Sequence, residues 1–495
     1  MNARPMNEPH AEQRPASSRP ALSAPGPARR AHYPSRRNLP GRPSSTDPAR
    51  RVAFEALSAV RERDAYANLV LPALLREHGL SGRDAALATE LTYGTLRGLG
   101  TYDAILGACV DRPLEALDPP LLDVLRLGAH QLLATRVPPH AAVSATVALA
   151  REVLTAGPAR LANAVLRRVA GQDLEAWLAQ VAPLDGPDPD AALAVRTSHP
   201  TWIVRALRDA LVADGRDPAD LADLLAADNV APRVMLAVRP GRGSVDELVV
   251  AGGVPGRWSP WAVELPGGDP GMLAAVRTGR AGVQDEGSQL LALAVEARRG
   301  EMVVDFCAGA GGKTLLLGAM MRSTGRLYAF DVADKRLAKL KPRMARAGLS
   351  NVHPILISNE NDIRVKRLAG KVDRVLVDAP CSGLGTLRRN PDLKWRQSPQ
   401  GVDELIHKQT DILTAAARLL KPGGRLVYAT CSILEEENAA IVDAFLATHA
   451  GFHRLSAQEV LAAQGIAIDC GEDLRLSPHK HGTDGFYAAV LERVK

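Results

Sequence analysis

The 495-residue sequence predicts a multidomain protein with an all-α N-terminal domain, a small α+β connecting subdomain and a C-terminal α/β domain built on a doubly wound sheet. The length exceeds what one hydrophobic core usually organises. Apolar residues recur at helical spacing over 47–180, with no strand pattern between them. Beyond residue 285, short apolar strands alternate with helical stretches, which is typical of a doubly wound sheet.

Basic charge is concentrated in the first fifty residues. They hold nine arginines, no lysine and three acidic residues, which accounts for the whole net charge of +6, because the rest of the chain carries 52 basic and 52 acidic residues. Ten prolines and few apolar residues in this stretch predict a disordered Arg/Pro-rich tail over 1–46. Its arginines either hold RNA phosphates loosely or have no specific role.

The five cysteines are widely spaced, and long apolar runs are lacking. These two features argue against a disulfide-linked, metal-binding, membrane or secreted protein. No CxxC pair occurs, so reduced thiols and no metal are expected, and "HKHG" (479–482) lacks further ligands at suitable spacing. No run of about 18 apolar residues and no secretory h-region are found, which predicts a cytoplasmic protein with no membrane association.

Breaks and capping residues divide the first two domains into elements. Asp47-Pro48 suits the start of a helix, and a stretch rich in Pro, Gly and Asp at 182–192 predicts a domain boundary. The breaks expected between helices lie at 79–83, 111–120, 137–139 and 157–158. The α+β subdomain is expected over 193–283, with helices near Trp202–Leu211 and Leu221–Ala227 and a strand at 233–238.

The α/β domain is expected over 284–495. Its strands are predicted at "MVVDF", "RLYAF", "VHPILI", "RVLVD", "RLVYAT" and "GFYAAVLERV". In open sheets the ligand lies beyond the carboxyl ends of the strands. After the first strand comes the glycine-rich "CAGAGGKT", which fails the P-loop pattern at Cys307 and the dinucleotide fingerprint at Thr314. Asp331 ends the second strand and suits either ribose hydroxyls or a helix N-cap. Together these features indicate an adenosine ligand without phosphates, and S-adenosylmethionine fits that description.

Two cysteines follow the next strands, Cys381 in "DAPCSG" and Cys431 in "YATCS". Ser432 and Glu435 have capping-box spacing, which would place Cys431 just before a helix N-terminus and favour its thiolate. Thiolate addition to C6 of a pyrimidine makes C5 nucleophilic enough to take a sulfonium methyl group. Asp378 would assist at cytosine N3, if protonated when it donates. These residues alone do not say which cysteine attacks.

The motifs "VQDEGSQL", "VVDFCAGAGGKT", "VDAPCSGLGTLRRNPDLKW" and "YATCSILEEEN" resemble the NOL1/NOP2/Sun family of RNA cytosine-5 methyltransferases. The helical domain over 47–180 resembles a NusB-like RNA-binding domain, through "LTYGTLRG", "LRLGAHQLL", "VPPHAAVSATVALA" and "NAVLRRV". The resemblance implies a Rossmann-like class I methyltransferase domain with a seven-stranded sheet. It also implies 16S ribosomal RNA of the small subunit as the substrate.

The same resemblance implies residue roles. Cys431 is expected to be the nucleophile, Cys381 to assist product release, and Asp378 to lie between the cofactor and the base. Asp331 is expected to hold the ribose of S-adenosylmethionine. The rest of the expected cofactor site comprises Cys307, Ala308, Gly309, Ala310, Gly311, Gly312, Lys313 and Asn359.

Two positions depart from the family pattern. Ala310 stands where the cofactor loop usually has a proline, and Asn359 stands where the third strand usually ends in an aspartate, with Asp362 three residues later. An amide both donates and accepts where a carboxylate only accepts. Cofactor binding is expected to survive both changes.

Basic residues form two groups near the expected site. The first is carried by the helix expected over 333–347 and comprises Lys335, Arg336, Lys339, Lys341, Arg343 and Arg346. The second comprises Arg388, Arg389, Lys394 and Arg396, with Trp395 among them. The first group is either a solvated face or an RNA contact. The second is predicted to be the better RNA contact, because phosphate pairing and base stacking can act together there.

The sequence therefore predicts a monomeric, S-adenosylmethionine-dependent RNA cytosine-5 methyltransferase acting on small-subunit ribosomal RNA. A tRNA cytosine-5 methyltransferase and a non-catalytic RNA-binding ribosome assembly factor are the alternatives. Retention of Cys381, Cys431 and Asp378 disfavours the non-catalytic reading.

Overall fold

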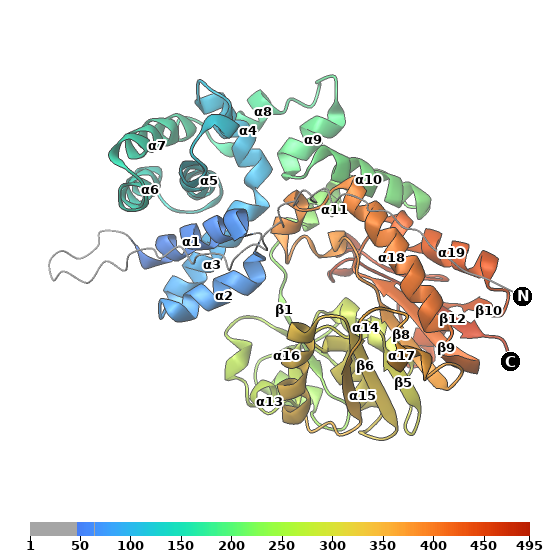
Figure 1. The fold of residues 1–495 in the computed structure, drawn as a ribbon. Coiled ribbons are helices and arrows are strands. Elements are labelled where there is room, and N and C mark those ends of the chain that lie inside the picture. The colour runs from blue at the N-terminus through green and yellow to red at the C-terminus, as the bar shows by residue number, and fades with distance from the viewer. Residues whose placement is uncertain (1–46, 64) are drawn as a thin grey trace, which may run out of the picture. The chain divides into compact units, whose positions relative to one another are not determined.

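The computed structural model describes residues 47–63 and 65–495. The tail predicted over 1–46 lies outside the described residues. Within the described part, the chain folds into a helical region, a small mixed region and a large α/β region, as Figure 1 shows.

The helical region begins where Asp47 caps the first helix, because its Oδ1 accepts a hydrogen bond from Ala49 N at 2.8 Å. Figure 1 shows these helices in blue to teal. They are α1 (Pro48–Arg63), α2 (Ala67–Glu77), α3 (Gly82–Arg97), α4 (Leu99–Cys109), the 3-10 turn η1 (Leu114–Ala116), α5 (Pro119–Ala134), α6 (Pro139–Val153), α7 (Ala156–Val169) and α8 (Leu174–Val181).

One of the predicted helix breaks is wrong. The break expected at 157–158 lies earlier, because α7 begins at Ala156 and contains Gly157 and Pro158 in its first turn. Backbone N–H groups of a first helical turn have no partner within the helix, so a proline there removes no hydrogen bond.

The middle of the chain combines five α-helices with a small antiparallel sheet. The predicted helices and the strand at 233–238 are confirmed, and three further strands complete the sheet in the order β2-β3-β1-β4. The elements are α9 (Pro189–Thr197), α10 (Thr201–Ala213), α11 (Asp220–Ala227), β1 (Val234–Val238), α12 (Val245–Val250), β2 (Val254–Pro255), β3 (Ala262–Leu265), η2 (Pro270–Met272), α13 (Ala274–Arg277) and β4 (Ala281–Val283).

The C-terminal region contains the six predicted strands and two that the sequence reading missed. The elements are α14 (Glu286–Val295), β5 (Met302–Asp305), α15 (Gly312–Met320), β6 (Arg326–Asp331), α16 (Asp334–Arg346), β7 (Val352–Leu356), α17 (Ile363–Lys366), β8 (Val372–Asp378), η3 (Leu384–Thr386), η4 (Pro391–Trp395), α18 (Pro399–Ala417), β9 (Leu420–Thr430), η5 (Glu435–Glu437), α19 (Ala439–Thr448), β10 (Phe452–Leu455), α20 (Ala457–Ala462), β11 (Leu474–Leu476), α21 (Pro478–His481) and β12 (Phe486–Arg493).

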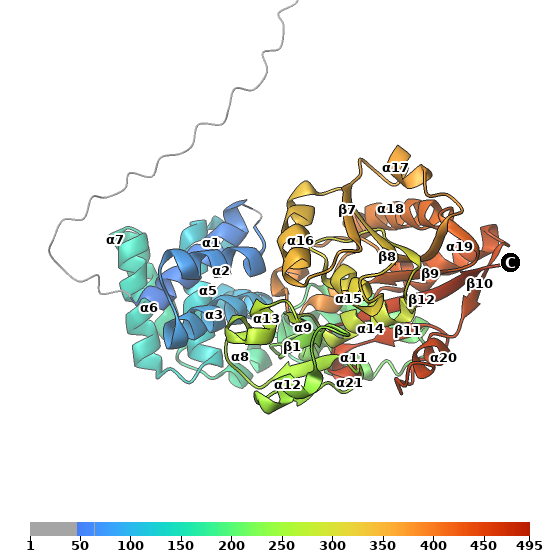
Figure 2. The ribbon, with the colours of Figure 1, turned by 90° about the horizontal axis from the view of Figure 1, so that it is seen from below.

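The large sheet has eight strands rather than the seven expected. Seven follow the order β10-β12-β9-β8-β5-β6-β7, and β11 pairs with β12 outside this path. The strands β9, β8, β5, β6 and β7 run parallel, whereas β12 is antiparallel to β9. Figure 2 shows the helices that cover this sheet from a second direction.

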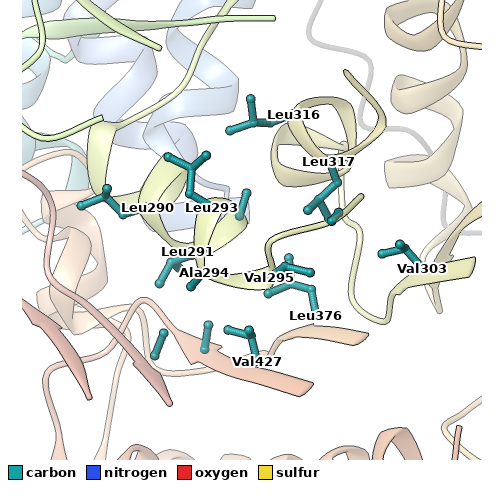
Figure 3. Packing of buried hydrophobic residues seen from close by; sticks show 14 of the residues in the cluster. Leu290, Leu291, Leu293, Ala294, Val295, Val303, Leu316, Leu317, Leu376 and Val427 are labelled. Atoms are coloured by element: carbon teal, nitrogen blue, oxygen red, sulfur yellow. The ribbon is translucent and has the colours of Figure 1, made fainter. Parts of the chain in front are cut away.

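Two hydrophobic clusters cover opposite faces of the sheet. Consecutive residues of β8 divide between them, since Leu376 joins the cluster around α14 and α15, whereas Val375 and Val377 join the cluster around α18 and α19. Figure 3 shows Leu290, Leu291 and other residues of α14 packed between α15 and the strand residues Leu376 and Val427. The buried strands hold their carboxyl ends in fixed positions, and the loops that follow them are expected to carry the chemistry.

Candidate active site

A glycine-rich turn joins β5 to α15. Gly309 and Gly311 adopt φ angles of 56° and 84°, which favour glycine, and Gly311 N donates to Ala308 O at 2.8 Å to close the turn. A Cβ atom at Gly309 would meet nothing within 4 Å, so space is open on that side of the loop. The turn therefore leaves room for a ligand beside exposed backbone.

Asp331 connects this turn to the end of β6. Its Oδ2 accepts from Gly309 N at 2.8 Å and its Oδ1 accepts from Ala333 N at 2.7 Å. The alternative role as helix N-cap is not realised, because α16 starts at Asp334 with Ala333 as the capping residue. Each carboxylate oxygen keeps a second lone pair, so Asp331 retains acceptor capacity toward ribose hydroxyls.

Asp305, at the end of β5, belongs to the same group of carboxylates, and the sequence analysis did not single it out. Its Oδ2 accepts from Thr314 Oγ1 at 2.6 Å, whereas its buried Oδ1 has no hydrogen-bond partner among the described residues. Burial raises the pKa of Asp305 to about 7. A buried acceptor without a donor fits the ammonium group of a bound amino-acid moiety. The sequence feature that could have identified Asp305 was its position at the carboxyl end of a predicted strand.

The two departures from the family pattern have local partners. Ala310 O accepts from Arg343 Nη1 at 2.6 Å, so an arginine of α16 holds the turn that a proline would otherwise preset. Asn359 is exposed, and its Oδ1 accepts from Asn361 N at 2.9 Å. Asp362 is occupied as the N-cap of α17, because its Oδ1 accepts from Arg364 N at 2.9 Å.

The two cysteines meet although they are fifty residues apart. Cys381 Sγ lies 3.3 Å from Cys431 Sγ, and Cys431 N donates to Cys381 Sγ at 3.3 Å. The hydrogen bond with Cys431, together with burial, raises the pKa of the Cys381 thiol well above its usual range. The raised pKa favours the protonated thiol at Cys381, whose sulfur lies against that of Cys431.

Lys313 and Asp378 form an ion pair beside the thiols. Lys313 Nζ donates to Asp378 Oδ2 at 2.8 Å, which joins the first turn of α15 to the end of β8. Burial alone would lower the pKa of Lys313, but the charge and hydrogen bond of Asp378 raise it above its usual value, and the Cys431 sulfur contributes in the same direction. The ammonium group therefore lies close to both the Asp378 carboxylate and the Cys431 sulfur.

Glu437 holds the two cysteine loops together. Its carboxylate accepts from Ser382 N at 2.8 Å, from Ser382 Oγ at 2.5 Å and from Gln409 Nε2 at 2.9 Å. The side chain is fully buried, and Gln409 Nε2 also donates to Pro380 O at 3.0 Å. The residue after Cys381 is thus fixed to the segment that follows Cys431.

The capping box predicted at Ser432 and Glu435 is wrong. Ser432 Oγ accepts from Leu434 N at 3.1 Å, and Glu435 pairs with Arg475 at 3.0 Å. The turn η5 starts at Glu435, and α19 begins only at Ala439. Cys431 therefore does not stand directly before a helix N-terminus, because Ser432 caps a local turn instead.

We expect Glu437→Ala to lower the free energy of unfolding by about 3 kcal/mol, because it leaves three buried donors without their acceptor. Chemical denaturation monitored by circular dichroism measures this change. Glu436→Ala is the matched control, since Glu436 is exposed, and it should change the stability by less than about 0.5 kcal/mol. Equal stability of the two variants would contradict a structural role for Glu437.

Within the second basic group, the structure contradicts an exposed RNA contact at Arg388 and Lys394, which are buried, whereas Trp395 is 38% exposed. RNA contact by the group as a whole stays a prediction. Arg388 Nε and Arg389 Nε donate to the Asp484 carboxylate at 2.7 Å and 2.8 Å. Arg389 Nη2 also donates to Asp285 Oδ2 at 3.0 Å. Burial and the neighbouring Asp484 raise the pKa of Asp285 to about 6. These arginines attach the Pro-Cys loop to the start of α14 and to the residues before β12.

Lys394 is fully buried between the helical region and the catalytic loops. Its Nζ donates to Asn229 Oδ1 at 2.5 Å and to Ser198 O at 3.0 Å. The neighbouring Trp395 ring lies against the helical region, where a Cβ atom added to Gly100 would meet it at 2.5 Å. The segment predicted to stack on RNA bases instead joins two regions of the chain.

The described residues contain neither a cluster of metal ligands nor a helix suited to spanning a membrane. In residues 47–63 and 65–495, no three His, Cys, Asp or Glu side chains are grouped as a metal ion would require. None of the helices described in the same part of the chain combines the length and the hydropathy needed to cross a membrane.

Comparison with known proteins finds two family models on this chain. One, described as 16S rRNA methyltransferase RsmB/F, matches residues 292–492, and the NusB family matches residues 47–171. A protein of Mycobacterium tuberculosis that carries a methyltransferase name is 47% identical, over 90% of this chain and 97% of its own length. The ribosomal RNA small subunit methyltransferase B of Klebsiella pneumoniae is 32% identical, over 90% of this chain and 98% of its own.

Solved structures share the fold. The crystal structure of PH0851 has a TM-score of 0.74 at 24% identity and covers 92% of this chain and 100% of its own. That of NSun6 from Pyrococcus horikoshii has a TM-score of 0.51 at 18% identity, over 59% of this chain. Similarity at these identities supports the arrangement of the elements.

Proposed function

Because the chain belongs to the RsmB/F family of 16S rRNA methyltransferases and carries a NusB domain, we propose that it methylates C5 of a cytosine in 16S ribosomal RNA with S-adenosylmethionine. The reaction proceeds through a covalent bond between Cys431 and C6 of the base. One observation carries this proposal, namely the contact of the two thiols at 3.3 Å beside the Lys313–Asp378 ion pair.

The cofactor site is proposed along the turn from Cys307 to Lys313. Asp331 holds the ribose, the unpaired Oδ1 of Asp305 faces the ammonium group of the amino-acid moiety, and Asn359 lies on the adenine side. When bound, S-adenosylmethionine supplies an electrophilic methyl group on a sulfonium. No other atom would lie within 4 Å of a Cβ atom at Gly309, so a ligand can approach the backbone there.

Cys431 supplies the nucleophile. Its thiolate attacks C6 and forms the carbon–sulfur bond, and the electron pair of the C5–C6 double bond moves toward N3 and C5. Because Cys381 retains its proton and Lys313 places an ammonium group nearby, the negative charge of the attacking sulfur is stabilised before the base arrives. The target base must already be unstacked to reach the sulfur.

Asp378 and Lys313 neutralise the negative charge that develops at N3 by supplying a proton. Lys313 Nζ donates to Asp378 Oδ2 at 2.8 Å, so the ammonium of Lys313 supplies the proton for N3 through that oxygen. This proposal refines the expectation that Asp378 donates alone. After methyl transfer, a water molecule takes the C5 proton, the electron pair of that C–H bond re-forms the C5–C6 double bond, and the Cys431–C6 bond breaks to leave the Cys431 thiolate. The N3 proton returns to Lys313 through Asp378. Cys381, whose sulfur touches Cys431, assists this elimination.

We expect Lys313→Met to lower kcat by about 10²–10⁴, the range in which a general acid–base group contributes. Single-turnover methyl transfer at saturating cofactor and RNA measures the chemical step. Lys371→Met is the control, because Lys371 is an exposed lysine directly before β8, at the opposite end of that strand from Asp378. An unchanged single-turnover rate for Lys313→Met would remove the lysine from the mechanism.

The remaining assignments are part of the same proposal. The helical NusB-like domain over 47–180 holds RNA, 193–283 connects it to the catalytic domain over 284–495, and the protein acts as a monomer in the cytoplasm. The described fold and the NusB family match support the helical domain and its separation from the catalytic domain.

The decisive experiment supplies purified protein and methyl-labelled S-adenosylmethionine with 16S ribosomal RNA or with a tRNA pool. We expect label in 5-methylcytosine of the 16S RNA, detected by nucleoside mass spectrometry, and little in tRNA. Label in tRNA alone would overturn the ribosomal substrate. Label in a base other than cytosine would overturn the C5 assignment, and no label in either RNA would favour an assembly factor without catalysis.

A further inference from the structure

The exposed face of α16 carries a row of basic side chains. Arg336, Lys339, Arg343 and Arg346 are spaced three, four and three residues apart, so they lie on one side of the helix. All are exposed except Arg343, which is half-buried. We call these four residues the α16 stripe. The first turn contains the acidic residue Asp334, and the stripe itself contains none.

The α16 stripe begins beside the cofactor loop and ends beside the small α+β region. Arg343 Nη1 donates to Ala310 O in the glycine-rich turn at 2.6 Å. At the other end, a Cβ atom added to Gly279 would meet the Arg346 carbonyl oxygen at 2.7 Å, and Gly348 lies against the guanidinium of Arg242. The helix contacts β6 and the edge strand β7, and Figure 2 shows α16 beside β7. The row thus runs along one border of the proposed active site.

Charges in this row are not neutralised within the described part of the chain. None of the ion pairs found among residues 47–63 and 65–495 involves a member of the α16 stripe or the neighbouring Arg239. Burial and Arg346 lower the pKa of Arg343, and burial, Arg343 and Arg346 lower the pKa of Arg239 to about 10. Arg239 Nε donates only to a carbonyl, Gly279 O, at 2.9 Å. Like charges at this density repel, and a polyanion would relieve that repulsion.

A merely solvated helix face would not explain this arrangement. Exposed helices commonly mix the two charge signs, because opposite charges three or four residues apart stabilise each other. Elsewhere in this chain arginines have such partners, as in the Arg51–Glu55 pair, four residues apart, and the Arg126–Asp123 pair, three residues apart. In contrast, the α16 stripe repeats one sign over ten residues, or about 15 Å of helix.

We propose that the α16 stripe binds the ribose-phosphate backbone of the RNA substrate beside the base that is methylated. This inference rests on the proposed function, because it assigns a surface to the same RNA. It replaces the Arg388–Arg396 segment, whose cations are occupied inside the protein, as the principal phosphate contact of the catalytic domain. Arg343 connects this surface to the cofactor turn, so backbone contacts and cofactor binding share one helix.

The test removes three charges from the row. Arg336→Gln, Lys339→Gln and Arg346→Gln are combined, and Arg343 is left because it holds Ala310 O. The matched control combines Arg367→Gln, Lys371→Gln and Arg418→Gln. These are exposed cations near the amino end of β8, where Gly370 N donates to Arg418 O at 3.0 Å. Both triple variants lose the same formal charge.

Dissociation constants for a 16S fragment are measured by fluorescence anisotropy between about 50 and 200 mM salt. We expect the slope of log K against log salt to fall by about 2 for the α16 variant, since each single-strand phosphate contact contributes about 0.7. Affinity at the lower salt concentration should drop about tenfold. The control and the charge-preserving variant Arg336→Lys, Lys339→Arg, Arg346→Lys should keep the wild-type slope.

Methylation kinetics separate this inference from the proposed function. The α16 variant should show a raised KM for RNA with kcat unchanged, and thermal melting should match that of the wild type. Equal slopes for the α16 variant and the control would overturn the RNA surface even if the wild type methylates cytosine. A different outcome is that the wild type transfers no methyl group while the α16 variant still shows a reduced slope of log K against log salt. That result would contradict the proposed reaction but support the RNA-binding surface.

Discussion

Cys431→Ala is expected to abolish methyl transfer, and Cys381→Ala is expected to trap a covalent protein–RNA adduct. The first variant removes the sulfur that bonds to C6, so no C5 nucleophile forms. The second leaves Cys431 free to attack but removes the thiol that lies 3.3 Å from it and assists its departure. The structure therefore predicts opposite outcomes for two residues that contact each other.

Denaturing gel electrophoresis with end-labelled RNA distinguishes these outcomes, because only a covalent adduct survives denaturation. Cys381→Ala should give a slowly migrating band, whereas wild type and Cys431→Ala should give none. Cys470→Ala is the control, since Cys470 lies outside the site and pairs through its backbone with Gln458. A stable adduct from Cys431→Ala, with free unmethylated RNA from Cys381→Ala, would reverse the two roles.

The elements that carry the site could be predicted from the sequence because they depend on local patterns. Buried parallel strands appear as apolar runs, and the residues that follow them must reach the same edge of the sheet. For this reason Cys381, Cys431, Asp331 and the glycine-rich turn were found without a structure. The short strands β10 and β11 were missed, because three or four residues with mixed polarity carry no clear period.

Interactions across the chain could not be predicted in the same way. The partners of Glu437 lie 28 and 55 residues away along the chain, and the Lys313–Asp378 pair spans 65 residues. No local spacing in the sequence predicts contacts between residues so far apart along the chain. The capping-box interpretation failed for the same reason, because it assigned Glu435 to a neighbour when its partner, Arg475, is 40 residues distant.

The number of basic residues near the Pro-Cys loop was a poor guide to which of them can contact RNA. A run containing arginines, a lysine and a tryptophan suggested RNA, but composition does not reveal whether a carboxylate is folded against it. Asp484 and Asp285 come from segments about 100 residues away on either side of Arg388. For α16 the sequence left two interpretations open, a solvated face and an RNA contact, because a run of cations on one helix does not show whether acidic partners lie against it.

The internal role of these arginines leads to a second large effect. Asp484→Asn is expected to lower the free energy of unfolding by about 3 kcal/mol, because it leaves the buried guanidinium of Arg388 and the half-buried guanidinium of Arg389 short of a negative partner. Urea denaturation of the purified protein measures the change. Asp443→Asn is the control. Its side chain is 65% exposed and pairs with Arg454 at the surface, so its loss should cost less than about 1 kcal/mol.

RNA binding by Asp484→Asn decides between the two interpretations of Arg388 and Arg389. If these arginines contacted phosphates, removing the competing carboxylate would free them and raise RNA affinity, with a steeper salt dependence and little change in stability. If Arg388 and Arg389 instead stabilise the fold, the free energy of unfolding falls. The salt dependence of RNA binding by the protein that remains folded then stays at the wild-type value. We expect the second result, because Arg388 is nine-tenths buried and both guanidinium groups are already hydrogen-bonded to Asp484 and Asp285. Methylation should then weaken as the Pro-Cys loop loses its anchor, without any change in the phosphate contacts themselves.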